Sequence, residues 1–405
     1  MVPRFEPFAA LRYASDPLPD VIAPPYDVLS EHELADYQRR SKHNISHIDV
    51  PRGGADRYAR AAELLRRWRR DGVLVCDPQP SFTIYRLRFT DASGRHRDVA
   101  GVVGGLEVVD EGVGGVLPHE RTTPKASTDR LDLTRATAAN LSPVWGLSLA
   151  SGLSEMLAEP AEVVGTVRED GVEHVVERVT DTARIATISA AVASDDVLIA
   201  DGHHRYAISR VYRDEVRVAT GRRDTPAEET LAFVSELVED QLSVEAIHRL
   251  YSDTTLGELK AQLATYFDLT VTEPPDPQTL RAMEADGFLV LVGPNDAWRL
   301  TAKPGAFDGV RTVDGAWLEA TLADFEASVA YQHGLDETLA EVAKGNAAAA
   351  VLIRPVSVSE IKRTAREALL MPPKSTFFTP KLKTGLVVRP LADTALVEND
   401  ASQWK

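Results

Sequence analysis

The chain has 405 residues, 44% hydrophobic and 26% charged, with a net charge of −16. The length exceeds one typical core, so two or three domains are expected, and the composition argues against a largely disordered chain. The acidity disfavours nucleic acid or an anionic membrane as partner, because both require a broad basic surface. No signal pattern opens the chain and no stretch approaches about 18 apolar residues, so a cytoplasmic protein is expected.

The first part of the chain mixes helical and strand patterns. Pro24 and Pro25 indicate an extended segment, and Ser30 with Glu33 fits a capping box for a following helix. Cys76, the single cysteine, excludes an internal disulfide and follows an apolar run, so a buried thiol is predicted. The further expected elements are an amphipathic helix at 56–70 with a solvated arginine face, antiparallel strands within 73–110, a polar helix at 127–140, and two strands and a helix within 160–200.

A composition shift near residue 252 indicates a second region. We predict domains at 1–251, 252–345 and 346–405, the last returning to the site carried by the first. The segment 229–251 fits a helix or a strand equally. The elements expected after it are helices at 255–267 and 315–329, a strand at 288–293, a strand at 350–355 and a helix at 358–370.

The most informative stretch runs from Val197 to Tyr206. Four apolar residues predict a buried strand, and Asp201 or Gly202 then caps a helix. His203, His204 and Arg205 therefore fall in the first helical turn, where positive side chains are unfavourable unless an anion binds among them. Helix N-termini bind phosphate readily, so an anion site is predicted, against the alternative of a solvated turn.

Two further polar segments fit such a site. His119-Glu120-Arg121-Thr122 places an acid among cationic and hydroxyl groups, with a polar interdomain loop as the alternative. Lys374-Ser375-Thr376 resembles the end of a P-loop, but prolines replace its glycine run, so a Walker-type NTPase is rejected. These three residues remain candidate phosphate ligands, with packing of a C-terminal loop as the alternative.

A protein-only metal site is not expected. No His-Glu-x-x-His motif occurs, and adjacent His203 and His204 point in different directions on a helix. Mg²⁺ arriving with a nucleotide needs only one or two carboxylates, which Glu120 and Asp201 provide. Neither a nucleophile elbow nor a Gly-x-Gly-x-x-Gly fingerprint occurs.

Five motifs in order along the chain resemble the DUF1015 family, whose name supplies no reaction. They are Pro24-Pro25-Tyr26-Asp27-Val28-Leu29-Ser30, Pro118-His119-Glu120-Arg121-Thr122, Ala139-Asn140-Leu141-Ser142-Pro143, Ala200-Asp201-Gly202-His203-His204-Arg205-Tyr206 and Met371-Pro372-Pro373-Lys374-Ser375-Thr376-Phe377-Phe378. A closing Lys381-Leu-Lys-Thr-Gly385-Leu also fits.

The Asp-Gly-His-His-Arg turn is also similar to the phosphate-binding motif of the ParB/sulfiredoxin superfamily, which includes free-serine kinases. The resemblance implies an α+β (mixed α/β) fold with a ParB/sulfiredoxin-like nucleotide-binding core. The same resemblance implies that phosphate binds to Gly202, His203, His204 and Arg205. Sulfiredoxin needs a cysteine where His203 stands, so that activity is not expected.

We therefore expect a phosphotransferase that moves a phosphoryl group from ATP or ADP, with Mg²⁺, to a small hydroxylated metabolite such as free serine. Glu120, Asp201 and His204 are the candidate catalytic residues. The candidate phosphate ligands are Gly202, His203, Arg205, Arg121, Thr122, Lys374, Ser375 and Thr376. A non-catalytic nucleotide or phosphometabolite sensor and a nucleotide hydrolase are the alternatives, and a homodimer stays open.

Overall fold

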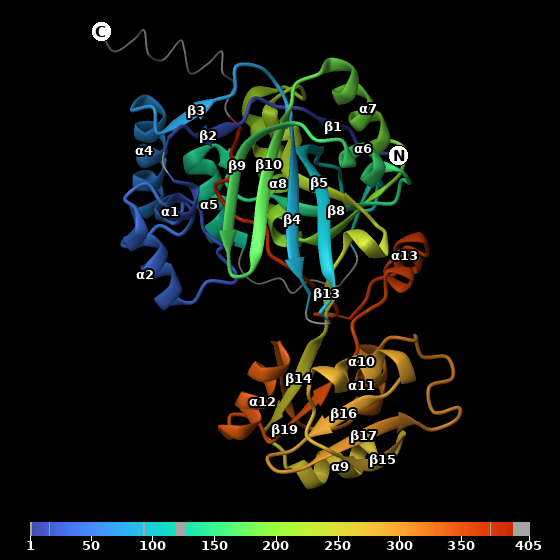
Figure 1. Cartoon of the computed structure of the whole chain (residues 1–405). Coiled ribbons are helices and arrows are strands. Elements are labelled where there is room, and N and C mark those ends of the chain that lie inside the picture. The colour runs from blue at the N-terminus through green and yellow to red at the C-terminus, as the bar shows by residue number, and fades with distance from the viewer. Residues whose placement is uncertain (1, 16, 92–93, 119–126, 373, 392–405) are drawn as a thin grey trace.

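The computed structural model describes residues 2–391, apart from 16, 92–93, 119–126 and 373. These residues form two lobes of unequal size, each built around one sheet (Figure 1). Helices and strands alternate along both lobes, so the predicted mixed α/β class is confirmed. None of the helices in the described ranges has the length and apolar character needed to cross a membrane.

The larger lobe contains a nine-stranded sheet of mixed direction. Its order is β6-β11-β8-β12-β5-β4-β10-β9, with β1 added to β5. The strand β11 pairs parallel with β6 on one side and antiparallel with β8 on the other, so it is not an edge strand of the sheet. The strands are β1 (Phe5–Glu6), β4 (Phe82–Thr90), β5 (His96–Glu107), β6 (Val116–Pro118), β8 (Val144–Ser148), β9 (Glu162–Glu169), β10 (Val172–Val179), β11 (Val197–Asp201) and β12 (Glu229–Glu236).

Both faces of this sheet are covered, and strand β12 shows how the sequence achieves this. Leu231 and Phe233 pack into the core on one face, whereas Ala232 and Val234 pack into the core on the other. A strand buried on both faces is a continuous apolar run with no alternation. The segment 229–251, which fitted a helix or a strand, therefore consists largely of strands, with a short 3-10 turn η2 (Glu239–Gln241) between them.

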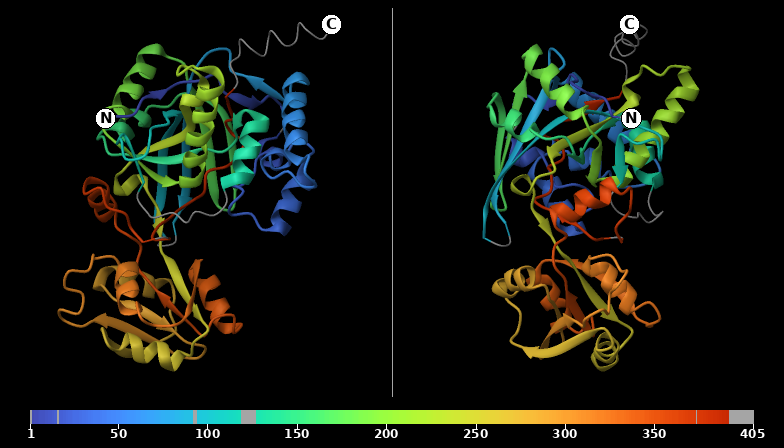
Figure 2. Two further views of the ribbon diagram at one scale, coloured as in Figure 1. Left: turned by 180° about the vertical axis from the view of Figure 1, so that it is seen from behind. Right: turned by 90° about the vertical axis from the view of Figure 1, so that its right-hand side faces the viewer.

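Helices pack against the sheet without enclosing it, as the rear and side views show (Figure 2). The predicted capping box of Ser30 and Glu33 is confirmed at the start of α2. In α4, Ala61, Leu65 and Trp68 are buried at helical spacing, and most of the arginines are exposed or half-buried, as predicted. The helices are α1 (Leu18–Val21), α2 (Glu31–Arg40), α3 (Ser46–Asp49), α4 (Arg57–Arg70), α5 (Ser127–Thr137), α6 (Leu153–Ala158), α7 (Thr182–Val192), α8 (His203–Thr220) and the 3-10 turn η1 (Pro226–Glu228).

The smaller lobe contains a six-stranded sheet in the order β15-β17-β16-β19-β14-β18. Its strands are β14 (Ile247–Ser252), β15 (Phe267–Thr272), β16 (Leu289–Val292), β17 (Ala297–Ala302), β18 (Ser328–His333) and β19 (Ala349–Leu352). Its helices are α9 (Leu256–Leu263), α10 (Pro277–Asp286), α11 (Asp314–Thr321) and α12 (Leu335–Ala343). The chain enters this lobe through β14 and leaves it after β19 (Figure 1).

After the smaller lobe the chain returns to the larger one. Helix α13 (Val358–Arg366) is followed by β20 (Phe377–Phe378), which pairs with β13 (Val244–Glu245), and by β21 (Arg389–Pro390), which pairs with β7 (Ala139–Asn140). Phe378 is buried with its ring centroid 5.8 Å from that of Trp145. This C-terminal return segment, residues 371–391, therefore completes the core of the larger lobe.

Several predictions of local structure were wrong in detail, and one of these is the helix predicted at 358–370, which ends at Arg366. Cys76 is exposed, because β3 (Leu74–Cys76) is a short strand paired with β2 (Leu11–Tyr13) that buries only Leu74. The helix predicted at 315–329 ends at Thr321, and residue 328 begins strand β18. The helix predicted at 255–267 ends at Leu263, because Phe267 begins a strand that buries its ring in the lobe core.

Candidate functional site

The turn between β11 and α8 has the local structure that the sequence predicted. Val197 to Ala200 are buried in the sheet, and α8 begins directly after Gly202. Gly202 has φ +88°, a left-handed conformation that glycine adopts without steric cost. A Cβ atom at this position would lie 3.1 Å from Cζ of Arg205, so the turn and the arginine fit closely together.

The carboxylate of Asp201 is held by two cations. Oδ1 accepts a hydrogen bond from Nζ of Lys381 at 2.6 Å, and Oδ2 accepts one from Nη2 of Arg205. Burial raises the pKa of Asp201, but Lys381 and Arg205 outweigh burial and hold that pKa well below its usual range. Asp201 is therefore a fixed negative charge at the end of the strand.

Arg205 links this turn to the residue that precedes strand β8. Its Nη1 atom donates to the carbonyl oxygen of Pro143, while Nη2 donates to Asp201. Burial lowers the pKa of Arg205, and the nearby Asp201 and Asp27 more than restore it, so the guanidinium stays charged. Nε of Arg205 is buried and has no hydrogen-bond partner among the described residues.

The N-terminus of α8 carries partial positive charge. Its N-cap residue, Gly202, has no side chain to cap the helix, and the dipoles of the 18 helical residues align. His203 and His204 lie in its first turn and are both partly buried. Partial positive charge at such an end favours an anion, and phosphate is the usual one.

A small cavity of about 50 Å³ lies beside this turn and includes Arg205 in its wall. Asp49, at the end of α3, also lines it and is only 3% exposed. Nη1 of Arg130 donates to the Asp49 carbonyl at 2.6 Å and lies 3.3 Å from its Oδ1. The guanidinium of Arg130 also covers the ring of Tyr26, with Cζ 4.4 Å from the ring centroid. The cavity is thus lined by charged, polar and apolar residues that come from several separate segments of the chain.

The structure brings some of the predicted residues together. Asp201, Gly202, His203, His204 and Arg205 form one turn. Glu120, Arg121 and Thr122 lie outside the described residues, so their roles stay predictions.

The second predicted phosphate-binding segment has a different environment. Lys374 is exposed, whereas Ser375 and Thr376 are buried. The Ser375 hydroxyl donates to the carbonyl of Pro372 at 2.7 Å. This bond is typical of a hydroxyl that shapes its own loop, and the contribution of the three residues to phosphate binding stays a prediction.

Sequence reasoning missed several residues of the site. Lys381 and Tyr26 lie within the quoted family motifs, but nothing in their spacing indicated a contact with Asp201 or Arg130. Asp49 is the last residue of the short helix α3, and nothing in its sequence context indicated a binding role. Pairs separated by 81 residues, as Asp49 and Arg130 are, become visible only in the fold.

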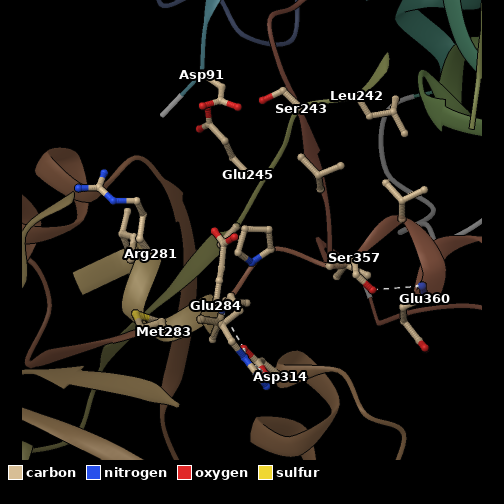
Figure 3. Close-up of a pocket in the computed structure, with 18 of the residues that line it drawn as sticks. Asp91, Leu242, Ser243, Glu245, Arg281, Met283, Glu284, Asp314, Ser357 and Glu360 are labelled. Carbon is tan, nitrogen blue, oxygen red and sulfur yellow. Dashed lines mark hydrogen bonds and ion pairs between the residues drawn. The ribbon is translucent and has the colours of Figure 1, made fainter. Parts of the chain in front are cut away.

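A second cavity, of about 530 Å³, lies between the two lobes (Figure 3). It contains none of the predicted site residues. At one end the carboxylates of Asp91 and Glu245 point toward one another (Figure 3), while Arg97 pairs with Asp91 and Arg354 pairs with Asp314. Burial raises the pKa of Glu245, and Asp91 raises it further, while a bond from Thr379 lowers it. The lining includes six carboxylates and four guanidinium groups, and this excess of negative charge disfavours phosphate.

Comparison with known proteins places the chain in a family. It belongs to the family described as "Protein of unknown function (DUF1015)", whose model matches residues 5–327, as the motifs predicted. No curated protein matches the chain.

Solved structures with some similarity include a mutant of free serine kinase in complex with AMP, with 13% identity and a TM-score of 0.37, covering 67% of this chain and 89% of that one. C-terminally truncated SbnI from Staphylococcus aureus has 11% identity and a TM-score of 0.38, covering 75% and 97%. A conserved hypothetical protein from Pyrococcus furiosus has 13% identity and a TM-score of 0.36, covering 67% and 92%.

Proposed function

We propose that this protein binds a nucleotide by its phosphates at the N-terminus of α8 and transfers a phosphoryl group to a small hydroxylated metabolite. ATP or ADP with Mg²⁺ is the proposed donor. Free serine is the first acceptor to test, because the turn resembles that of free-serine kinases. Phosphoryl transfer depends mainly on positioning and charge stabilisation, which a preformed turn can supply.

One observation carries the proposal: a helix N-terminus with glycine as its N-cap follows a carboxylate that two cations hold in place. Asp201 fixes Arg205 from one side and Lys381 fixes Asp201 from the other. The turn is therefore organised before any ligand arrives, and less ordering is needed on binding. His204 would stabilise charge on the transferring group, and Lys374 would approach it from the return segment.

Mg²⁺ is proposed to arrive with the nucleotide. Within the described ranges, no group of three or more His, Cys, Asp or Glu side chains could hold a metal ion. A nucleotide-bound Mg²⁺ needs only one or two carboxylates and otherwise keeps its water ligands. Both Asp201 oxygens already accept hydrogen bonds from cations, so we assign Asp201 a positioning role.

The test is a thermal-shift and calorimetric titration with ATP, ADP and GTP in the presence of Mg²⁺. Wild type should be stabilised by about 2.7 kcal/mol at 100 times the dissociation constant. Arg205→Lys should bind at least tenfold more weakly, whereas Arg210→Lys on the same helix should bind as wild type. Absence of binding by any nucleotide to wild type overturns the proposal. Binding without transfer to any acceptor or to water supports the sensor instead.

A further inference from the structure

Two residues that line the cavity beside the β11–α8 turn each carry a buried polar atom without a hydrogen-bond partner among the described residues. Oδ2 of Asp49 is a hydrogen-bond acceptor, and Nε of Arg205 is a hydrogen-bond donor. Both residues line the cavity of about 50 Å³. A buried polar atom without a partner costs free energy, so such atoms indicate a missing group.

The charges and hydrogen-bonding needs of the cavity restrict the chemistry of the missing group. The guanidinium groups of Arg130 and Arg205 disfavour a cation, and an anion, which these groups attract, has no hydrogen to donate to Oδ2 of Asp49. A neutral hydroxyl can donate to Asp49 and accept from Arg205 at the same time. The volume suits a group of this size, since one water molecule occupies about 30 Å³ in the liquid.

We propose, on the basis of the function proposed above, that this cavity receives the hydroxyl group of the phosphoryl acceptor and that Asp49 accepts its proton. In the reaction the hydroxyl oxygen forms a bond to the γ-phosphorus of ATP. The bond from that phosphorus to the bridging oxygen breaks, and ADP leaves with the electron pair. The hydroxyl proton passes to Oδ2 of Asp49, which later releases it to solvent.

The environment of Asp49 suits a proton acceptor. Burial raises the pKa of its carboxyl, and the charges of Arg130 and Arg205 offset only part of that increase. A carboxylate with a raised pKa is a stronger base than an exposed one. Arg205 belongs both to this cavity and to the first turn of α8, so a hydroxyl held here lies beside the proposed phosphate site.

The experiment compares Asp49→Asn with Asp268→Asn, which makes the same change at an exposed carboxylate on β15. Nucleotide affinity and phosphoryl transfer to L-serine and glycerol are measured for both over a range of pH. Asp49→Asn should keep nucleotide affinity within twofold of wild type and lower the transfer rate at least 100-fold. It should also remove the acidic limb of the pH–rate profile, whereas Asp268→Asn should leave both quantities unchanged.

The outcomes separate the two proposals. If nucleotide binds and Asp49→Asn transfers as fast as wild type, the hydroxyl subsite is overturned while the proposed function stands. The same holds if Glu120→Gln alone abolishes transfer, or if Asp49→Asn lowers only stability, as loss of a structural water would. If wild type binds no nucleotide, the proposed function fails, and weakened L-serine binding by Asp49→Asn would still support the subsite.

A wild-type crystal structure with ADP and L-serine tests the subsite without any substitution. The serine hydroxyl should lie within hydrogen-bond distance of Oδ2 of Asp49. Serine bound elsewhere overturns the subsite, even if Asp49→Asn cannot be folded.

Discussion

Nζ of Lys381 lies 2.6 Å from Oδ1 of Asp201, although the two residues are 180 positions apart in the chain. The lysine side chain is also held over the ring of Phe377, with Nζ 4.4 Å from the ring centroid. Asp201 ends a strand of the large sheet, and Lys381 belongs to the return segment. This ion pair therefore couples the conformation of the β11–α8 turn to the docking of the C-terminal return segment.

Replacing Lys381 by methionine should destabilise the protein. The side chain of Lys381 is 16% exposed and that of Asp201 is 22% exposed, so removing the lysine leaves a poorly solvated carboxylate. We expect a loss of about 1–3 kcal/mol in the free energy of unfolding, measured by urea denaturation. Lys344→Met, which breaks an exposed ion pair with Glu341, should change it by less than about 1 kcal/mol. Equal effects of the two changes would contradict a structural role for the Asp201 pair.

Gly202→Ala should disturb the turn more than the same change at the other end of α8. Gly202 and Gly221 both have positive φ, at +88° and +69°, so both substitutions carry a backbone cost of about 1–2 kcal/mol. Only the Cβ at position 202 would meet a neighbour, Arg205. We expect nucleotide binding to weaken in Gly202→Ala and not in Gly221→Ala, as measured by calorimetry. Equal affinities would indicate that the Arg205 contact does not matter for binding.

The stability of both lobes should fall in mild acid because each contains a buried neutral histidine. Burial lowers the pKa of His174 to about 4, with Lys383 adding to the effect, and burial lowers that of His248 to about 4. Each pKa lies below the unfolded value of 6.5, so at pH 5 the unfolded state binds the proton and the folded state does not. Stability is therefore fully present above pH 6.5 and is lost as the pH falls toward 4.

Each histidine should contribute a loss of about 2 kcal/mol between pH 7 and pH 5. Urea denaturation at the two pH values checks this. His174→Gln and His248→Gln should each reduce the pH dependence by that amount, because glutamine does not titrate. An unchanged dependence in either variant would show that the pKa of that histidine is the same in the folded and unfolded states.

Phe378→Ala should loosen the return segment from the sheet. Phe378 is 1% exposed and packs with Trp145 in the core of the larger lobe. Truncating a buried phenylalanine costs about 3–5 kcal/mol, whereas Leu370→Ala at an exposed site should cost little. Denaturation and tryptophan emission are the measurements. Unchanged stability in Phe378→Ala would mean that the segment contributes nothing to the core.

The sequence predicted the elements that carry local signals. The strand ending at Asp201, the glycine cap and the capping box at Ser30 all depend on residues within four positions of one another. The errors arose where tertiary packing determines the burial of a residue or the type of an element. Cys76 follows an apolar run, yet the short strand that contains it buries only Leu74. Strand β12 is apolar on both faces, so its pattern could not be distinguished from that of a helix.

The candidate site could be predicted only in part. The residues of the β11–α8 turn are contiguous in the sequence, and their side chains predict an anion site. Asp49, Arg130 and Lys381 join it from three distant segments, and each is an ordinary charged residue in its own sequence context. Which carboxylate meets which cation depends on the pairing of β21 with β7 and on the position of α5, and local patterns carry no information about either.

The route of the chain has a consequence for protein synthesis. All nine strands of the large sheet lie before residue 237, whereas Lys381 and Phe378 come after the whole six-stranded sheet. Because translation proceeds from the N-terminus, the ribosome makes every strand of the first sheet long before the lysine that neutralises Asp201. A transcript that ended anywhere within the smaller lobe would yield a sheet whose turn lacks that lysine. The turn therefore acquires its lysine partner only after the ribosome has synthesised the entire smaller lobe.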